Sequence, residues 1–413
     1  MTRGLLATLA ALLLLAAGPD RAPAQADDAE PPRLSAAAAF AVEASTGEVV
    51  LAEGQDERRA IASTTKLMTA LVVREEASLD DTFTAADYQA APVESQIGLQ
   101  PGEEMTVRDL LRALLLESAN DAAVTLAEGV AGSEEAFVEQ MNARARDLGL
   151  ENTTFANPVG LDDPDNLSTA RDLVTLALAV REDAFLRETA GMEQATLESG
   201  ERTRVVTTRN ELVQETELVR GLKTGRTQEA GYVLVGSGTR DGVTVVSAVL
   251  GAPSEAARQE DTLALLRYGL GRFERVTAVR EADVVARVPL AYREGMAIPL
   301  AAGDTARYTV REDEELRRDV TGVPEEVDGP LERGTQLGTL VVRRGDEVVA
   351  RVPLVTTRAV EKAGVALRVD ELLSRPTTIL LLAVLAVCSV PLVVLRRRAL
   401  RRRQQRAQGG LVT

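Results

Sequence analysis

Two lysines are unusual in this chain because almost every other basic residue is an arginine. Of 47 basic residues only three are lysines. One of them, Lys66, follows Ser63 by three positions, which on a helix places both side chains on one face about one turn apart. A desolvated lysine can lose its proton, whereas arginine stays charged. The pair is therefore a candidate nucleophile and general base for acyl transfer, although a helix cap followed by a solvated lysine has the same spacing.

Two further motifs hold polar groups that such a reaction needs. Ser118 and Asn120 lie between two expected helices, in a tight connection that can face a cleft. A hydroxyl there can relay a proton to a leaving amine, and a carboxamide can hold a substrate amide. The second lysine, Lys223, begins a Lys-Thr-Gly sequence before an expected strand and would add positive potential beside Ser118. Each motif alone also fits a helix end or a surface turn, but together they indicate one site.

The composition excludes most other catalytic designs. The chain has no histidine and a single cysteine, Cys388. A Ser/His/Asp triad, a Cys/His dyad, a disulfide within the chain and a histidine- or cysteine-ligated metal are therefore excluded, and we expect no cofactor and no metal. The net charge of −16 argues against nucleic acid as a partner, because phosphate binding needs basic surfaces.

The hydrophobic pattern predicts the elements that would position these motifs. Residues 36–42 and 48–52 flank a Ser-Thr-Gly turn, which predicts a hairpin, and the period then becomes helical. Thr106 with Asp109 three residues later is a capping pattern. Helices are expected after Ser63 and at 107–116, 121–128, 133–148, 171–180 and 255–269, and strands at 203–208, 232–237 and 243–250. Strands from both ends of this region would join one antiparallel sheet, with the helices packed on it.

The pattern changes again from residue 276, where short alternating strands suggest a small β-sandwich. These strands are expected at 284–289, 307–310, 335–342 and 348–355. The fold class we predict from this pattern is α+β: a domain with an antiparallel sheet packed with helices, then a small β-sandwich domain and a C-terminal transmembrane helix. The expected boundaries are a linker at 27–35, a catalytic domain at 36–272 and a β-rich domain at 273–360.

Both ends of the chain carry membrane signals. Residues 1–26 have the basic, apolar and small-residue parts of an export signal. Residues 377–395 form an uncharged apolar stretch long enough to span a bilayer, and the arginine-rich tail 396–413 marks the cytoplasmic side. With a connector at 361–376, these features predict a single-pass protein of the cell membrane, with its catalytic domain outside the cytoplasm and its C-terminus inside.

The three motifs, in this order, resemble the signature of penicillin-binding proteins and class A β-lactamases. The surrounding residues resemble one branch, the low-molecular-mass D-alanyl-D-alanine carboxypeptidases of the S11 serine peptidase family. The matching segments are 62–70 (ASTTKLMTA), 117–123 (ESANDAA), 152–155 (NTTF), 168–172 (STARD) and 221–227 (GLKTGRT). No Glu-x-x-x-Asn sequence lies between 154 and 173, where a class A β-lactamase places its deacylating glutamate, and this weakens the lactamase interpretation.

This resemblance implies a role for each polar residue of the motifs. Ser63 would be the acylated nucleophile, and Lys66 the base that takes its proton. Ser118 and Asn120 would shuttle protons and hold the peptide, and Lys223 would complete the network. These residues would act together as one acyl-transfer site.

The resemblance also implies a substrate-binding set. The backbone N–H groups of Ser63 and Arg226 would form the oxyanion hole, and an extended peptide would pair along the strand 223–227 by β-augmentation. Arg258 would help to bind the terminal carboxylate of the substrate, the alternative being a solvated helix residue. The full set is Lys223, Thr224, Gly225, Arg226, Thr227 and Arg258.

This resemblance implies a penicillin-binding/β-lactamase-like fold for the catalytic domain. It also implies a serine-type D-alanyl-D-alanine carboxypeptidase that removes the terminal D-alanine from peptidoglycan stem pentapeptides. The reaction would pass through an acyl-enzyme on Ser63, and β-lactam antibiotics would inhibit it covalently. A D,D-endopeptidase or a β-lactamase on the same fold remains an alternative, as does a non-catalytic module that binds the wall or senses β-lactams. The intact motif residues argue against such a module, because a scaffold needs none of them.

Overall fold

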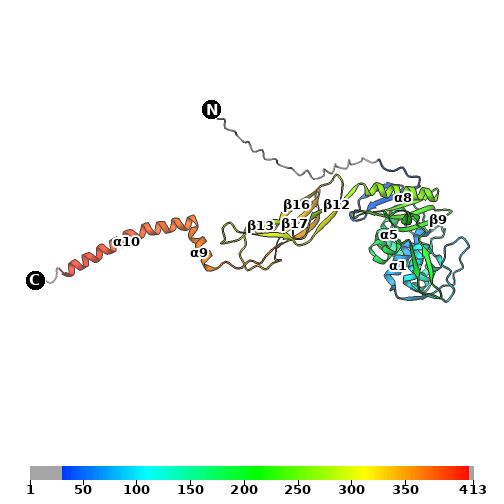
Figure 1. Cartoon of the computed structure of the whole chain (residues 1–413), viewed down its shortest axis with the longest axis horizontal. Helices are drawn as coiled ribbons and strands as arrows, with labels where there is room; N and C mark the ends of the chain where they lie inside the picture. Colours follow the sequence, from blue (N-terminus) through cyan, green and yellow to red (C-terminus); the bar gives the residue numbers. More distant parts are fainter. Residues whose placement is uncertain (1–29, 409–413) are drawn as a thin grey trace, which may run out of the picture. The chain divides into compact units, whose positions relative to one another are not determined.

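The computed structural model describes residues 30–408 and divides them into two compact units (Figure 1). The first unit reaches to Arg272 and the second begins at Phe273, apart from residues 241–243, which group with the second. The expected export signal, residues 1–26, lies outside the described residues. Each unit has a hydrophobic core of its own.

A five-stranded antiparallel sheet forms the centre of the first unit, in the order β2-β1-β11-β10-β9. The first expected strand is present as β1, which is buried along its whole length, and it pairs with β11, Ala38 opposite Leu250. This pairing confirms that strands from both ends of the region join one sheet. The strands are β1 (Ala38–Glu43), β2 (Val49–Glu53), β9 (Val219–Thr227), β10 (Gly231–Arg240) and β11 (Val243–Ala252).

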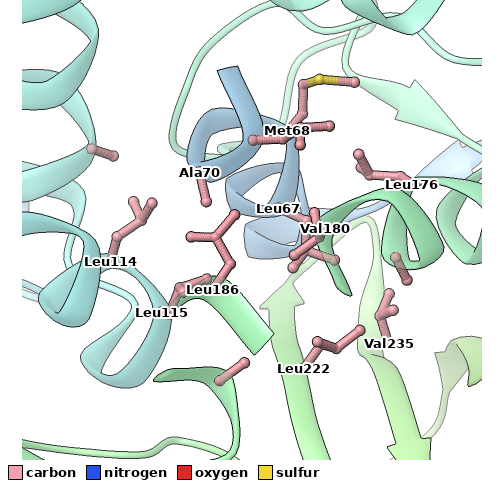
Figure 2. Packing of buried hydrophobic residues seen from close by; sticks show 14 of the residues in the cluster. Leu67, Met68, Ala70, Leu114, Leu115, Leu176, Val180, Leu186, Leu222 and Val235 are labelled. Carbon is pink, nitrogen blue, oxygen red and sulfur yellow. The ribbon is translucent and has the colours of Figure 1, made fainter. Parts of the chain in front are cut away.

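Helices cover both faces of this sheet (Figure 1). Helix α8 (Glu255–Leu270) packs on β10, β1 and β2. On the other side, α5 (Ala170–Glu182) packs on β1, and α1 (Lys66–Glu76) packs on α5. Figure 2 shows Leu67 and Met68 of α1 within this core, among leucines and valines from neighbouring helices and from β9 and β10. The core therefore fixes the helix whose first residue is Lys66.

The helix expected at 107–116 begins as predicted but ends differently. Its first residue is Val107, and the side chain of Thr106 caps it by accepting a hydrogen bond from the N–H of Asp109. Its last turn is a wider π-helix. Ser118 ends this turn, and the backbone of Ser118 is left-handed, with a φ of 62°. The remaining helices in this part of the chain are α2 (Val107–Arg112), the π-helix η2 (Ala113–Glu117), α3 (Asn120–Ala131), α4 (Glu134–Asp147), α6 (Ala184–Ala190) and α7 (Glu211–Glu215).

Three two-stranded ribbons complete the first unit. They are β3 (Arg59–Ala60) with β6 (Leu167–Ser168), β4 (Thr82–Thr84) with β5 (Glu104–Thr106), and β7 (Gln194–Leu197) with β8 (Arg204–Thr207). The strand expected at 203–208 is β8, but it pairs with β7 rather than with the central sheet. One edge of the central sheet is β9, which carries the Lys-Thr-Gly motif, and the other is β2.

The second unit is built from strands that share one apolar core. A two-stranded sheet pairs β12 (Phe273–Val279) with β15 (Ala306–Arg311). A five-stranded sheet has the order β13-β14-β18-β17-β16. Its strands are β13 (Val284–Pro289), β14 (Ala297–Ala302), β16 (Leu316–Thr321), β17 (Gln336–Arg344) and β18 (Glu347–Thr356). Both sheets contribute to the core, for example Ala278 from the first and Val288 and Leu354 from the second.

Two helices follow the β-rich part of the second unit. Helix α9 (Val365–Ser374) is short, and α10 (Pro376–Gln408) contains the apolar stretch expected at 377–395. Within the described residues, α10 is the one helix long and apolar enough to cross a membrane. It is therefore a candidate membrane anchor.

Candidate active site

The candidate nucleophile lies in a tight turn that the sequence pattern did not predict. Ser63 is part of a short 3₁₀ helix, η1 (Ala62–Thr65), and α1 begins one turn later, at Lys66. Ala62 has a positive φ of 48°. Two glycines allow the chain to approach this turn: a Cβ on Gly225 would lie 3.0 Å from the backbone N of Ser63, and one on Gly160 would lie 2.1 Å from the carbonyl oxygen of Ala62. The glycine of the Lys-Thr-Gly motif thus makes room for the serine turn.

The amine of Lys66 is fully buried beside this serine. Its Nζ lies 3.3 Å from Oγ of Ser63, 2.6 Å from Oδ1 of Asn120 and 2.5 Å from the carbonyl oxygen of Val159. Within the part of the chain that the structure describes, this amine forms no ion pair with a carboxylate. Because nothing neutralises the ammonium directly, the site favours the neutral amine.

The direction in which the pKa of Lys66 is shifted also favours the neutral amine. Burial lowers the pKa of Lys66 well below its usual value, and the positive charge of Lys223 lowers it further. The carboxylates of Glu94 and Asp121 oppose this shift. A lysine in these surroundings can accept the proton of a serine hydroxyl, which an ordinary solvated lysine does poorly.

The second motif lies where the π-helix meets α3. The π-type turn closes with a hydrogen bond from the N–H of Ser118 to the carbonyl of Ala113. Asn120 is the first residue of α3, and its Oδ1 faces Lys66. Ser118 is a buried residue, and among the described residues its Oγ has no hydrogen-bond partner, so the hydroxyl remains available to a substrate. Single π-type turns of this kind are frequent at functional sites.

The second buried lysine, Lys223, has a different environment. Its Nζ donates to the carbonyl oxygen of Thr224 at 3.0 Å. Burial, with the positive charges of Arg258 and Arg209, lowers the pKa of Lys223 to about 7, while Glu117 opposes the shift. The pKa of Lys223 is therefore close to neutral pH, and the positive charge of this lysine acts on Lys66.

The other residues of the predicted substrate-binding set divide into two groups. Arg226 and Thr227 line a cavity that also contains Ser63 and Asn120. Thr224 is buried, Gly225 packs on the serine turn, and Arg258 is not exposed to solvent. The guanidinium of Arg258 pairs with Glu255 at 2.6 Å, so the alternative of a solvated helix residue is wrong.

The cavity has a volume of about 490 Å³, and its lining includes Arg226 and Thr227 from the edge strand β9. The guanidinium of Arg226 makes a cation–π contact with the ring of Tyr232, and its central carbon lies 5.2 Å from the ring centre. The lining residues are Ser63, Val93, Glu94, Ser95, Asn120, Val159, Gly160, Leu161, Arg226, Thr227 and Gln228. This is a polar cleft with a serine hydroxyl, a carboxamide and a strand edge, which suits an extended peptide.

Comparison with known proteins decides the family. The family model described as D-alanyl-D-alanine carboxypeptidase, peptidase S11, matches residues 25–254, and the model for the C-terminal domain of penicillin-binding protein 5 matches residues 273–362. The D-alanyl-D-alanine carboxypeptidase DacF of Bacillus subtilis is 31% identical over 337 residues, which is 80% of this chain and 87% of that protein. DacC of Escherichia coli is 32% identical over 378 residues, 88% of this chain and 93% of the relative.

The chain belongs to the S11 family of D-alanyl-D-alanine carboxypeptidases.

Solved structures agree with this assignment. The crystal structure of DacD from Francisella tularensis has a TM-score of 0.58 at 26% identity, covering 81% of this chain and 95% of that one. The Streptomyces K15 DD-transpeptidase has a TM-score of 0.55 at 34% identity, covering 58% of this chain and 98% of its own. The predicted family, the α+β fold and the class of serine-type hydrolase are therefore confirmed.

Two charged residues of this S11 carboxypeptidase site were not predicted from the sequence. Glu94 lines the cavity, and Arg209 acts electrostatically on Lys223 and contacts the carboxylate of Glu117. Glu94 lies on a long loop and Arg209 after a short strand, where no spacing rule links them to the motifs. Only the fold brings them to the lysines.

Proposed function

We propose that this S11 carboxypeptidase removes the terminal D-alanine from peptidoglycan stem pentapeptides through an acyl-enzyme on Ser63. The observation that carries the proposal is the contact between Ser63 Oγ and a fully buried lysine amine that has carbonyl partners but, among residues 30–408, no carboxylate partner. The relatives named above, which are D-alanyl-D-alanine carboxypeptidases, support the choice of substrate.

Acylation begins when the hydroxyl of Ser63 attacks the carbonyl carbon of the last peptide bond. The neutral amine of Lys66 takes the hydroxyl proton as the new C–O bond forms. The backbone N–H groups of Ser63 and Arg226 stabilise the oxyanion. The close approach of Gly225 to the N atom of Ser63 supports this pairing, because it brings the strand that carries Arg226 next to the serine turn.

The leaving group and the hydrolysis step complete the cycle. Ser118 passes a proton to the nitrogen of the departing D-alanine, and the proton held by Lys66 replaces it through the network. Water then attacks the ester carbonyl and gives one proton to the neutral amine of Lys66. This proton passes to Oγ of Ser63 as the ester C–O bond breaks, and the shortened peptide leaves as a carboxylic acid. A β-lactam enters the same acylation step, because its ring amide carbonyl reacts with Ser63 in place of the peptide bond.

Substrate binding uses the free edge of β9 and the cationic groups near it. An extended peptide that pairs with the strand adds backbone hydrogen bonds. Lys223, Arg258 and Arg209 would provide positive charge for the C-terminal carboxylate, since both arginines add to the effect of burial in lowering the pKa of Lys223. Binding an anion there would relieve the repulsion between them.

The same proposal places the enzyme at the cell membrane. Helix α10 would cross the bilayer, and the arginines from Arg396 onward would stay on the cytoplasmic side, leaving the catalytic unit outside the cytoplasm. Residues 27–35 and 361–376 serve as connectors in this arrangement, and 273–360 as a domain between the catalytic unit, 36–272, and the anchor.

The decisive experiment combines a release assay with mass spectrometry. Wild-type protein is expected to release D-alanine from a pentapeptide ending in D-Ala-D-Ala and to gain the mass of one benzylpenicillin on the peptide that contains Ser63. Ser63→Ala should lose both reactions. Ser78→Ala, which removes an exposed hydroxyl from a turn, should keep both. Release of D-alanine by Ser63→Ala at the wild-type rate would refute the assignment.

Transfer to an amine is a second candidate outcome for the same acyl-enzyme. The similar Streptomyces protein is named a DD-transpeptidase. Adding an amino-acid acceptor to the assay separates the two, because transfer yields a peptide with a new C-terminal residue and hydrolysis yields a free carboxylate. The full-length relatives named above favour hydrolysis.

A further inference from the structure

A carboxylate that no sequence motif predicted contacts the catalytic network from the side. Glu94 lines the active-site cavity on the loop that joins β4 to β5. Its Oε2 accepts a hydrogen bond from Nδ2 of Asn120 at 2.6 Å and another from the hydroxyl of Tyr88. Its Oε1 accepts from the N–H of Ala91 at 3.1 Å. Glu94 therefore holds the amide of Asn120 without touching Lys66 itself.

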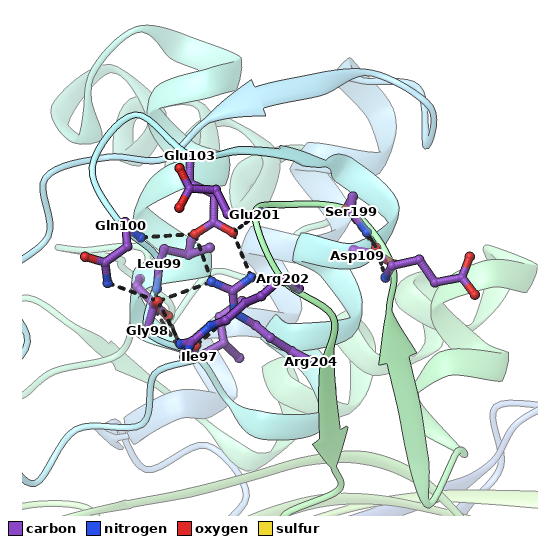
Figure 3. Close-up of polar contacts among 12 residues, drawn as sticks. Ile97, Gly98, Leu99, Gln100, Glu103, Asp109, Ser199, Glu201, Arg202 and Arg204 are labelled. Atoms are coloured by element: carbon purple, nitrogen blue, oxygen red, sulfur yellow. Dashed lines mark hydrogen bonds and ion pairs between the residues drawn. The ribbon is translucent and has the colours of Figure 1, made fainter.

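The loop that carries Glu94 is fixed from two sides. Asp121 in the first turn of α3 accepts from the N–H groups of Ile97 and Leu99. From the other side, Arg204 pairs with the buried carboxylate of Glu103 and donates to the carbonyl of Ile97 (Figure 3). These bonds hold the loop in place, so the carboxylate of Glu94 is a pre-organised partner of Asn120.

We propose that Glu94 is a positioning residue, which fixes the carboxamide of Asn120 with its oxygen toward Lys66 and thereby directs the lone pair of the neutral lysine at Ser63. The argument rests on the proposed roles of Ser63 as nucleophile and Lys66 as base. An ionised carboxylate only accepts hydrogen bonds, so the atom of Asn120 that faces Glu94 must be the amide nitrogen. The oxygen of Asn120 then faces Lys66.

This orientation determines where the lysine lone pair points. A neutral lysine amine has two N–H groups and one lone pair. The oxygens of Asn120 and Val159, at 2.6 and 2.5 Å, accept the two N–H groups. The remaining position faces Oγ of Ser63 at 3.3 Å. If the amide rotated by half a turn, its nitrogen would donate to the lone pair and compete with the serine for it.

The charges around the base allow a second readout. Lys66 is influenced by Lys223 on β9, by Asp121 on α3 and by Glu94 on the loop, and Glu94 raises the pKa of Lys66 against the effect of burial. Burial raises the pKa of Glu94 itself, but hydrogen bonds from Tyr88 and Asn120 outweigh this and lower it, so the group is charged at neutral pH. Removing its charge should lower the pKa of Lys66 further.

The test compares Glu94→Ala and Glu94→Gln with Glu104→Gln, an exposed glutamate of β5 that supplies the same loss of charge outside the cavity. The rate of acylation by benzylpenicillin is measured from pH 5 to 10 on the full chain in detergent, with the melting temperature as a control. Glu94→Ala should acylate at least about tenfold more slowly, because the amide is no longer fixed. Glu94→Gln, whose carbonyl can still accept from Asn120, should recover most of that loss, to within about threefold of wild type.

The pH profile separates positioning from a merely structural role. In both Glu94 variants the acid limb of the profile should move to lower pH, and in Glu104→Gln it should stay in place. Glu94 variants with the wild-type rate and an unmoved acid limb would overturn the inference, as would equal losses in Glu94→Gln and Glu94→Ala. Wild-type protein that fails to acylate at all would instead refute the proposed function on which the inference rests.

Discussion

The two units of the molecule differ in the polar groups that they bury. In the described part of the second unit, the buried polar residues are the threonines Thr309 and Thr356. The first unit buries carboxylates and cations alike: Glu43, Lys66, Glu103, Asp109, Asp121, Asp172, Arg204, Lys223, Arg258 and Asp261. Because burying a charge is costly unless it is paired or hydrogen-bonded, each of these groups in the first unit requires an explanation.

Within the first unit, the buried carboxylates and the buried lysines are stabilised differently. Asp109 accepts from the N–H groups of Glu198 and Ser199, and Asp261 accepts from the N–H of Ser35, near the start of the described residues. These carboxylates join segments distant in sequence and are satisfied as anions. Lys66, in contrast, has hydroxyl and carbonyl partners. We therefore expect a buried charge in this unit to be structural where donors or a counter-ion neutralise it, and reactive where they do not.

The largest effect is expected from replacing Lys66 by arginine, which keeps the charge but cannot give up its proton. Acylation by benzylpenicillin should fall roughly 100- to 10,000-fold, the usual contribution of a general base. Lys362→Arg makes the same change at the exposed third lysine and should have no effect. Since arginine is larger than the buried space, Lys66→Gln is measured beside it and should lose the same activity. Near-normal acylation in either Lys66 variant would show that the buried amine is not the base.

The sequence predicted the parts of this site that depend on short spacings. Ser63 and Lys66 lie three residues apart on consecutive helical turns, and Asn120 begins a helix, so local rules place them well. The π-helical turn before Ser118 was missed, because an apolar run of leucines is equally compatible with a regular α-helix. Glu94 was missed for another reason: its partner Asn120 is 26 residues away, and only tertiary contacts join them.

The same limit applies to the fold. The strands at both ends of the first unit were predicted, since buried strands have a clear apolar pattern. The pairing of β8 with β7 was not, because strand partners are chosen by the fold and not by the strand itself. The partition of the second unit into a five-stranded and a two-stranded sheet also depends on pairing that the sequence pattern does not contain.

A smaller effect, on stability, is expected from the neutralised pair of Glu103 and Arg204. Their atoms meet in two contacts at 2.7 and 2.8 Å, and the hydrogen bond from Arg204 lowers the pKa of Glu103 to about 2. Glu103→Gln leaves the guanidinium without its counter-ion and should reduce the free energy of unfolding by about 3 to 5 kcal/mol at pH 7. Acylation per folded molecule should fall far less than in the Lys66 variants.

The lowered pKa of Glu103 determines how the stability gap between wild type and Glu103→Gln changes with pH. Because the folded pKa of Glu103, about 2, is below its ordinary value of 4.5, the wild-type advantage is complete above pH 4.5 and disappears as the pH falls toward 2. Denaturant melts at pH 7 and pH 3 should show the gap between wild type and variant shrinking. Glu201→Gln, on an exposed side chain of the same region, is the control and should show no gap at either pH. A gap that is constant with pH would rule out the ion pair as its cause.

The smallest effect is expected from removing the second unit altogether. All residues that line the cavity belong to the first unit, which has its own core. The similar Streptomyces protein matches 58% of this chain with 98% of its own length, so that protein is about as long as the first unit. A variant of residues 27–272 should therefore acylate with benzylpenicillin within about threefold of the full chain. A fragment ending at residue 250 removes α8 from the sheet and should fail to fold. The contrary result would be a 27–272 fragment that melts cooperatively but acylates more than about tenfold slower than the full chain. The second unit, with its uncharged core, would then contribute to catalysis. The contrast between a reactive and an inert unit would be wrong.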